Sequence, residues 1–170
     1  MDGRAVKSCV LTTKKAVGRS IVTVEGLTHD EQEAFVYAFG KVGAVQCGFC
    51  IPGMVMAGKA LIDKVPDPSE DQIKVALRGN ICRCTGYVKI IDAILLAAEL
   101  FRKGEVPPAP ADWSLGQRVP RVDVEEKVTG TGIYPDDIYL DGMIYGSAVR
   151  SQYPRARVLA IHTEEARALP

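Results

Sequence analysis

Two cysteine pairs constrain this chain more than any other feature. Cys47 and Cys50 form a C-x2-C pair, Cys82 and Cys84 form a C-x-C pair, and 31 residues lie between the pairs (positions 51 to 81). Thiolates are soft ligands that suit zinc or iron-sulfur clusters, and four of them complete the ligand set of a [2Fe-2S] cluster. The fold is therefore expected to bring both pairs around one compact cofactor.

The residues that follow each pair favour the cluster. Pro52 predicts a helix that starts just after Cys50, and Thr85 predicts a helix N-cap just after Cys84. An all-cysteine cluster is anionic, and the free N–H groups at helix N-termini can hydrogen-bond its sulfurs. Room for close approach of the backbone is expected at three glycines, Gly48, Gly53 and Gly86.

A structural zinc site is the alternative that the spacing leaves open. C-x2-C is common in zinc sites, although a C-x-C half is unusual there. With zinc, the chain would be a zinc-stabilised interaction domain without catalysis. Iron with acid-labile sulfide, or one zinc per chain, separates the two interpretations.

Capping signals and apolar periodicity predict four short helices between residues 28 and 103. Two of them begin at capping boxes, Thr28 with Glu31 and Ser69 with Gln72. The expected ranges are 28 to 40 or 43, 52 to about 64, 69 to about 78, and 86 to 102. Four short helices of this kind predict a small bundle.

The segments on either side of this helical region have patterns that are typical of strands and a linker, not of helices. Short β-branched runs at residues 5–11 and 21–24 predict strands that lack neighbours, so the sequence is expected to start inside a domain. Three prolines make residues 104–112 the clearest linker. Beyond it, β-rich runs at 142–149 and 157–161 alternate with turns. The fold class predicted is a multi-domain α+β fragment.

Bulk properties exclude several kinds of partner and setting. The 170 residues contain 21 Lys plus Arg and 21 Asp plus Glu, so no net field favours nucleic acid or an anionic membrane. The longest apolar stretch, residues 90–100, is too short to span a bilayer, and the first four residues begin no signal peptide. A cytoplasmic, reducing setting is expected, in which the cysteines stay thiols.

The cysteine motifs resemble a known family. Residues 45–54 (VQCGFCIPGM) and 78–87 (RGNICRCTGY) resemble the signature of the helical [2Fe-2S] domain of molybdenum hydroxylases, the xanthine dehydrogenase and aldehyde oxidoreductase family. The resemblance implies a four-helix domain over residues 27–103 whose cluster is bound by Cys47, Cys50, Cys82 and Cys84. It also implies that Gln46 and Cys84 lie against molybdopterin in the complete enzyme.

Both flanks extend the resemblance. Residues 2–9 (DGRAVKSC) look like the end of a plant-type ferredoxin β-grasp domain, which makes 1–26 its C-terminal remnant. Cys9 would be a ligand only if the missing N-terminal part were present; on this chain alone we expect a small buried residue. Residues 116–123, 126–130 and 151–157 resemble the start of the α/β hammerhead domain (113–170), where the family more often has histidine at Arg155.

The resemblance implies an electron-transfer function. The chain would relay electrons from a molybdenum centre that oxidises aldehydes or xanthine-like N-heterocycles to an external acceptor, with no catalytic residue of its own. Its partner would be the remainder of the molybdopterin enzyme, in the same chain or another subunit, and a homodimer is allowed. The direct step from helical domain to hammerhead, without an FAD domain, matches single-chain aldehyde oxidoreductases or fused subunits.

Two other groups of residues are expected to have no functional role. His29 and His162 are far apart and lie beside acidic residues, so surface positions are expected. Met54 and Met56 are expected to pack with two phenylalanines, Phe35 and Phe39, in the helical core.

Overall fold

The computed structural model describes residues 1–108 and 114–169. Met1–Ile133 form one compact unit and Tyr134–Pro170 form a second. The first unit contains every cysteine and all the longer helices.

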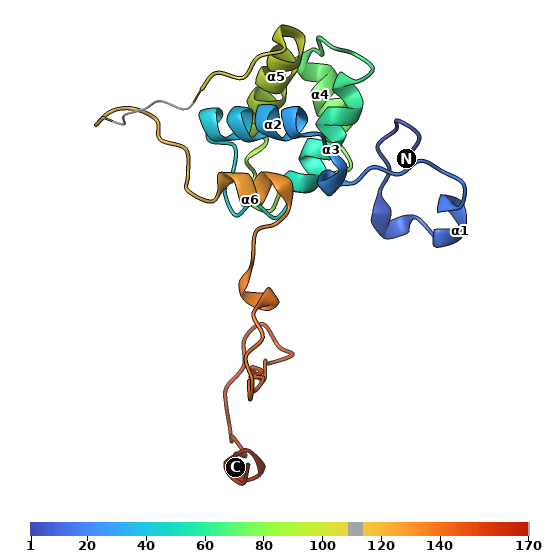
Figure 1. Cartoon of the computed structure of the whole chain (residues 1–170). Helices are drawn as coiled ribbons and strands as arrows, with labels where there is room; N and C mark the ends of the chain where they lie inside the picture. The colour runs from blue at the N-terminus through green and yellow to red at the C-terminus, as the bar shows by residue number, and fades with distance from the viewer. Residues whose placement is uncertain (109–113, 170) are drawn as a thin grey trace. The chain divides into compact units, whose positions relative to one another are not determined.

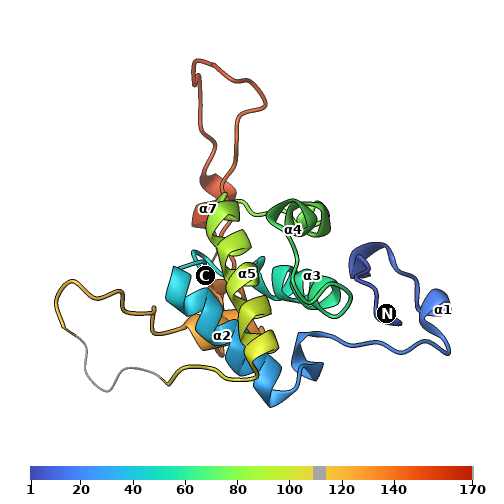
Figure 2. The same ribbon diagram turned by 90° about the horizontal axis from the view of Figure 1, so that it is seen from above.

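Four helices form the centre of the first unit, as predicted. They are α2 (His29–Val42), α3 (Ile51–Ile62), α4 (Glu70–Leu77) and α5 (Tyr87–Lys103). Helices α2 and α5 lie side by side in both views, and α3 and α4 pack against each other and against α5 (Figure 1, Figure 2). The predicted helical bundle is confirmed.

The helix ends follow the capping signals in the sequence. The Thr28 hydroxyl accepts a hydrogen bond from the Glu31 N–H at 3.4 Å, and the Glu31 carboxylate accepts one from the Thr28 N–H at 2.9 Å. Ser69 and Gln72 make the same reciprocal pair at 3.3 and 2.8 Å. Helix α2 ends at Gly43, whose φ is 68°. Both predicted capping boxes are confirmed.

The core lies where α2, α3 and α5 meet. Phe35, Phe39 and Met54 are fully buried, and the Phe35 ring meets Phe101 edge-on with centroids 5.3 Å apart. Their placement in the core is confirmed, whereas Met56 is only partly buried. A Cβ at Gly58 would lie 3.1 Å from Ile94 Cγ1, so glycine lets α3 approach α5 closely.

A further short helix, α6 (Val124–Thr129), packs on α2 and α3 (Figure 1). Val124 and Val128 are buried there. A Cβ at Gly40 would lie 3.3 Å from Pro120 Cβ, so the chain approaches α2 closely just before α6. The compact unit therefore continues past the expected linker, 104–112, to residue 133, while residues 109–113 lie outside the described part. The domain bounds given above stay a prediction.

The flanking segments that were expected to be strands are not strands in the described chain. Residues 8–10 form a 3-10 turn (Ser8–Val10), and short helical turns follow at α1 (Thr13–Ala16) and Val24–Gly26. Residues 142–149 and 157–161 carry no regular structure. A strand needs a hydrogen-bonded neighbour, and these segments have none within the described residues. The β-grasp and hammerhead assignments are therefore not confirmed.

The second unit contains two short elements. These are a 3-10 turn at Pro135–Asp137 and the helix α7 (Glu164–Arg167). Several large apolar side chains are exposed there, including Ile144, Val149 and Leu159. Packing within this unit does not bury these apolar side chains.

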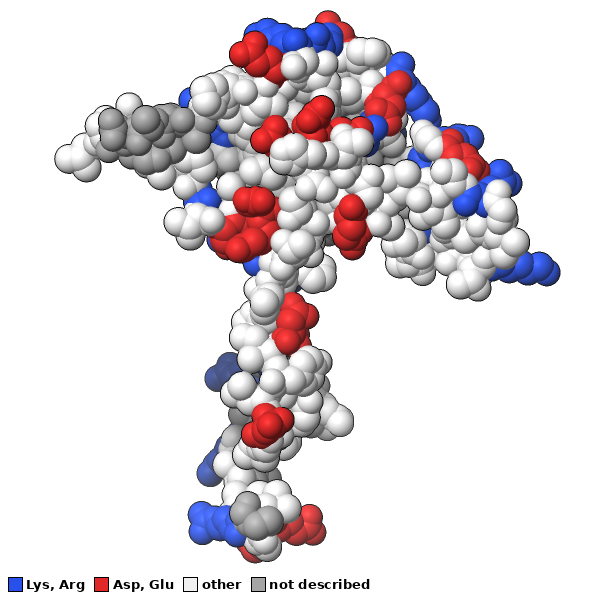
Figure 3. Space-filling model, in the orientation of Figure 1, with Lys and Arg blue, Asp and Glu red and all other residues white. Residues whose placement is uncertain are grey.

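For the distribution of charged side chains and the hydropathy of the helices, the composition predicts no strong charge bias and no membrane span. Acidic and basic side chains are interspersed over the face of the helical unit seen in Figure 3. In the part of the chain described, no helix is long and apolar enough to cross a membrane.

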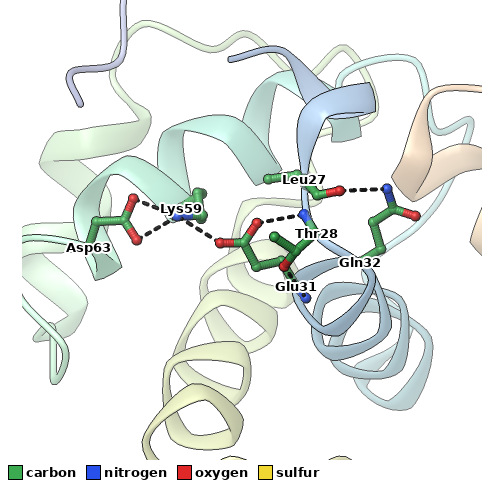
Figure 4. A network of polar contacts seen from close by, with 6 residues as sticks. All are labelled: Leu27, Thr28, Glu31, Gln32, Lys59 and Asp63. Atoms are coloured by element: carbon green, nitrogen blue, oxygen red, sulfur yellow. Dashed lines mark hydrogen bonds and ion pairs between the residues drawn. The ribbon is translucent and has the colours of Figure 1, made fainter. Parts of the chain in front are cut away.

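A polar network links the first turn of α2 to α3 (Figure 4). Lys59 pairs with Glu31 at 2.9 Å and with Asp63 at 2.6 Å, and its side chain is only 19% exposed. Burial disfavours the charge on Glu31, but hydrogen bonds from Lys59 and Thr28 outweigh it and lower the pKa of this carboxyl. The ionised form of Glu31 therefore stabilises the fold.

We predict that Glu31→Gln lowers the free energy of unfolding at pH 7 by about 1 kcal/mol, because it removes the charge paired with Lys59. A lowered folded-state pKa gives stability that is present above the unfolded-state pKa, about 4.3 for Glu, and is lost as pH falls through the folded-state value. The difference from wild type should therefore shrink in acid. Urea denaturation at a series of pH values measures it.

The control is Glu105→Gln, which removes an exposed carboxylate outside the helices. It should change the stability little at any pH. A Glu31→Gln effect that stays constant from pH 7 to pH 3 would contradict the assignment of the effect to the charge.

Candidate metal centre

Both cysteine pairs lie in loops that lead into helix N-termini. Cys50 is the N-cap residue of α3, and the Cys82–Cys84 loop leads into α5 through Gly86. Cys82 is buried, Cys50 and Cys84 are partly buried, and Cys47 is exposed. The predicted N-cap role of Thr85 is wrong, because that position belongs to Gly86, which makes no side-chain cap. The location of both loops at helix starts agrees with the sequence prediction.

The two loops meet at Cys50 and Cys82. The Cys50 thiol and Cys82 sulfur are hydrogen-bond partners, and burial, this bond and the nearby sulfurs of Cys82 and Cys47 raise the pKa of Cys50 to about 12. The fold thus brings at least three of the four predicted ligands into one electrostatic neighbourhood. Cys84 belongs to the same loop as Cys82, two residues on.

Backbone N–H groups surround the Cys82 sulfur. Burial opposes its ionisation, yet the N–H groups of Gly86, Cys84 and Thr85, together with the Cys50 thiol, lower the pKa of Cys82. Thr85 has a φ of 58°, in the left-handed region that non-glycine residues rarely adopt. The loop thus turns its donors toward one sulfur, which is the arrangement predicted for stabilising an anionic centre.

This donor set fits a [2Fe-2S] cluster. It offers soft sulfur ligands from two loops and backbone donors aimed at a sulfur, which stabilise negative charge on the centre. Within residues 1–108 and 114–169, no three Cys, His, Asp or Glu side chains gather closely enough to hold a single metal ion. The assignment of the four cysteines as ligands remains a prediction, and the chemistry of the loops supports it.

Gln46 lies on the first loop, and its side chain reaches the second loop. A Cβ at Gly86 would lie 3.3 Å from the Gln46 Nε2, so the amide rests against the start of α5. The side chain is otherwise exposed, directly before Cys47. It can therefore contact the Cys84 loop on one side and a further molecule on the other.

Tyr87 fixes the second loop, a role that was not predicted from the sequence. Its hydroxyl accepts a hydrogen bond from the Cys82 N–H at 2.8 Å and donates one to the Asn80 carbonyl at 3.1 Å. The signal was its position at the end of the RGNICRCTGY motif. Tyr87 therefore closes the turn that presents Cys82.

We predict that Tyr87→Phe destabilises the chain by about 1–3 kcal/mol, because it leaves the partly buried Cys82 N–H and the Asn80 carbonyl without this partner. Guanidinium denaturation of the two proteins measures the difference. Tyr37→Phe removes the same atom from α2 and serves as the control. Equal effects of both substitutions would show that the Tyr87 hydroxyl has no special role.

Residues after the linker contact the first cysteine loop. Arg121 donates hydrogen bonds to the carbonyls of Gln46 and Val45 and pairs with Asp123 through two contacts, one of them 2.8 Å. Arg121 and Gln46 are 75 residues apart in the sequence. No local pattern reveals such a contact, so the sequence did not predict it.

Other predicted residues lie outside this centre. Cys9 is exposed in the turn Ser8–Val10, so its interpretation as a small buried residue is wrong. The turn leaves its side chain in solvent because no strand covers it. His29 is exposed and lies 3.6 Å from Glu33, and His162 is exposed, as predicted. Arg83 is exposed between two of the cysteines.

Comparison with known proteins agrees with this chemistry. The family described as "[2Fe-2S] binding domain" matches residues 23–95. The solved structure of quinoline 2-oxidoreductase from Pseudomonas putida 86 is 44% identical with a TM-score of 0.54, over 62% of this chain and 67% of that one. The chain belongs to this iron-sulfur family. The predicted resemblance to the xanthine dehydrogenase and aldehyde oxidoreductase family is confirmed.

Two curated relatives differ in how much of their length this chain covers. The nicotinate dehydrogenase small FeS subunit of Eubacterium barkeri is 44% identical over 99 residues, 58% of this chain and 63% of the relative. The aldehyde oxidoreductase of Megalodesulfovibrio gigas is 35% identical over 188 aligned residues, 100% of this chain and 20% of the relative. The chain thus spans less than two thirds of either relative.

Proposed function

We propose that this chain is the electron-relay portion of a molybdopterin-dependent hydroxylase, with its [2Fe-2S] cluster held by Cys47, Cys50, Cys82 and Cys84. The observation that carries the proposal is the meeting of Cys50 and Cys82 between the starts of α3 and α5. The family match over residues 23–95 includes all four cysteines. When bound, the cluster supplies a one-electron redox couple.

The protein residues bind the cluster, stabilise its charge and keep water away from one side of it. The thiolates join two loops, so that each ligand bond also ties α3 to α5. Backbone N–H groups of Cys84, Thr85 and Gly86 stabilise negative charge beside Cys82. The buried apolar side chains of the bundle keep water from one side of the site, while the exposed Cys47 marks the other side. That open side is suited to electron exchange with a neighbour.

The neighbour we propose on the donor side is a molybdenum centre that oxidises an aldehyde or an N-heterocycle. Support comes from the names of the relatives, which include aldehyde oxidoreductase and nicotinate dehydrogenase. Gln46 and Cys84 would lie against the molybdopterin. Electrons would leave to an external acceptor, and a reducing cytoplasm would keep the thiols available for the cluster.

The test of the proposed function is the metal content of the purified full chain. We expect two iron atoms and two acid-labile sulfides at most, with a visible charge-transfer spectrum. One zinc per colourless chain would replace the proposal with the zinc-stabilised interaction domain. An iron count near four would mean that a second site forms around Cys9 with ligands from another chain.

For the molybdopterin contact we predict the effect of Gln46→Ala in an intact enzyme carrying this sequence. The amide has two donors and an acceptor, which suit the edge of a pterin ring, and loss of a buried amide's partners typically costs about 1–3 kcal/mol. The cluster spectrum should stay nearly unchanged, while molybdopterin retention or the rate of cluster reduction by substrate should fall.

The control for this prediction is Gln32→Ala. Gln32 lies in α2, where its amide donates to the Leu27 carbonyl at 3.0 Å. It should affect stability without affecting the cofactor. Normal molybdopterin content and normal cluster reduction in the Gln46→Ala enzyme would return Gln46 to a local structural role.

A further inference from the structure

A buried lysine lies on the first cysteine loop. Lys127 of α6 is 8% exposed, which is rare for this residue type. A Cβ built on Gly48 would lie 2.6 Å from the Lys127 Cδ and 2.8 Å from its Cγ, so the lysine stem rests directly on Gly48. Gly48 lies between Cys47 and Cys50. Lys127 thus covers the turn that presents the first cysteine pair.

A second glycine, Gly132, lies close to the charged end of the same side chain. A Cβ at Gly132 would lie 3.0 Å from both the Cδ and the Nζ of Lys127. The stem is therefore enclosed between Gly48 and Gly132. The ammonium group is two bonds beyond the Cδ atom that lies on Gly48, which places a positive charge next to the cysteine turn.

Arg121 and Asp123 are the charged side chains just before Lys127 in the chain. Asp123 is engaged by Arg121 through two contacts, and this pair is the main reason that the pKa of Asp123 is lowered. Lys127 contributes only the smallest favourable effect on that carboxyl. The other acidic residues of α6, Glu125 and Glu126, are exposed and screened by solvent.

This lysine lies outside the part of the chain that the family match covers, residues 23–95. It also lies after the linker, on a helix that packs on α2 and α3. A cation taken out of water is stabilised by a nearby anion, and the cluster proposed above is an anion. The cysteine loop and the helix α6 therefore complement each other in charge as well as in shape.

We propose that Lys127 is a positioning residue of the cluster, with two effects. Its stem fixes the Cys47–Cys50 turn, and its charge favours the reduced, more negative state of the cluster. The proposal rests on the [2Fe-2S] assignment made above. Removing the charge should therefore lower the reduction potential, because reduction adds an electron to the centre.

The experiment uses the full chain carrying its cluster, with potentiometry followed by the visible and electron paramagnetic resonance signals. Lys127→Met keeps the apolar stem and removes the charge. We expect the equilibrium constant for reduction to fall about tenfold, which for a one-electron couple is a shift of about 59 mV to lower potential. Lys127→Arg keeps the charge, so its potential should lie closer to wild type than that of Lys127→Met. Lys103→Met, at the far end of α5, should not change the potential.

A second variant tests the proposal even if Lys127→Met does not retain its cluster. Gly132→Ala leaves the lysine in place but puts a methyl group 3.0 Å from its Cδ and Nζ, at a position without the left-handed backbone of Gly48. It should lower the potential in the same direction at normal iron content.

The outcomes separate this proposal from the one on which it rests. A wild-type chain without iron and sulfide would refute the proposed function. A normal cluster whose potential is unchanged in Lys127→Met would overturn the role of Lys127 alone. That role would also be overturned if Lys127→Met and Lys127→Arg both lost the cluster while Gly132→Ala kept the wild-type potential.

Discussion

Replacing Cys82 with serine should leave the chain without a stable cluster. Cys82 is buried, receives three backbone N–H groups and adjoins Cys50. Iron and sulfide content should fall at least about tenfold, and the bundle should lose stability because ligand binding and folding are coupled. The same loss is expected for Cys47, Cys50 and Cys84. Iron analysis and thermal unfolding measure both effects.

The control is Cys9→Ser. Cys9 is exposed in a turn of the N-terminal segment, away from both cysteine loops in the sequence, and its substitution should leave the cluster intact. The ligand assignment would be wrong if Cys9→Ser removed the iron while Cys82→Ser retained it.

The second large effect is expected for Gly48→Ala. Gly48 has a φ of +88°, and a Cβ there would lie 2.6 Å from the Cδ of Lys127. The methyl group would strain the backbone, at about 1–3 kcal/mol for a non-glycine residue in such a conformation, and would also displace the lysine stem. We expect lower stability in denaturation experiments and a faster loss of the cluster on dialysis against a chelator.

Gly43→Ala is a matched control for that experiment. Gly43 also has a positive φ, 68°, but a Cβ there would meet nothing within 4 Å. It should therefore show the backbone effect alone. If Gly48→Ala destabilised the chain no more than Gly43→Ala and kept the cluster equally long, the contact with Lys127 would not constrain the loop.

The helical bundle could be predicted because its signals are local. Thr28 with Glu31 and Ser69 with Gln72 are spaced to satisfy the first N–H groups of a helix, and both pairs do so. Thr85 is the instructive exception. Its backbone is left-handed and its hydroxyl donates to the Cys84 carbonyl at 2.8 Å, so it cannot cap α5. The loop around Cys82 overrides the capping preference of the residue.

The flanks could not be predicted in the same way, because their structure depends on distant partners. Residues 5–11 have the composition of a strand but no neighbour to pair with in the described chain, so Cys9 is exposed rather than buried. The contacts of Arg121 and Lys127 with the cysteine loop join segments separated by the linker. No local pattern indicates these contacts, because the residues that meet lie more than seventy positions apart.

The covalent link between α5 and α6 has a consequence for how the site behaves on dilution. In this chain α6 reaches the cysteine loop without losing the translational freedom of a separate molecule, so its occupancy there does not depend on protein concentration. The same helix on a separate polypeptide would have to bind from solution, and the loop would lose its cover as the protein was diluted.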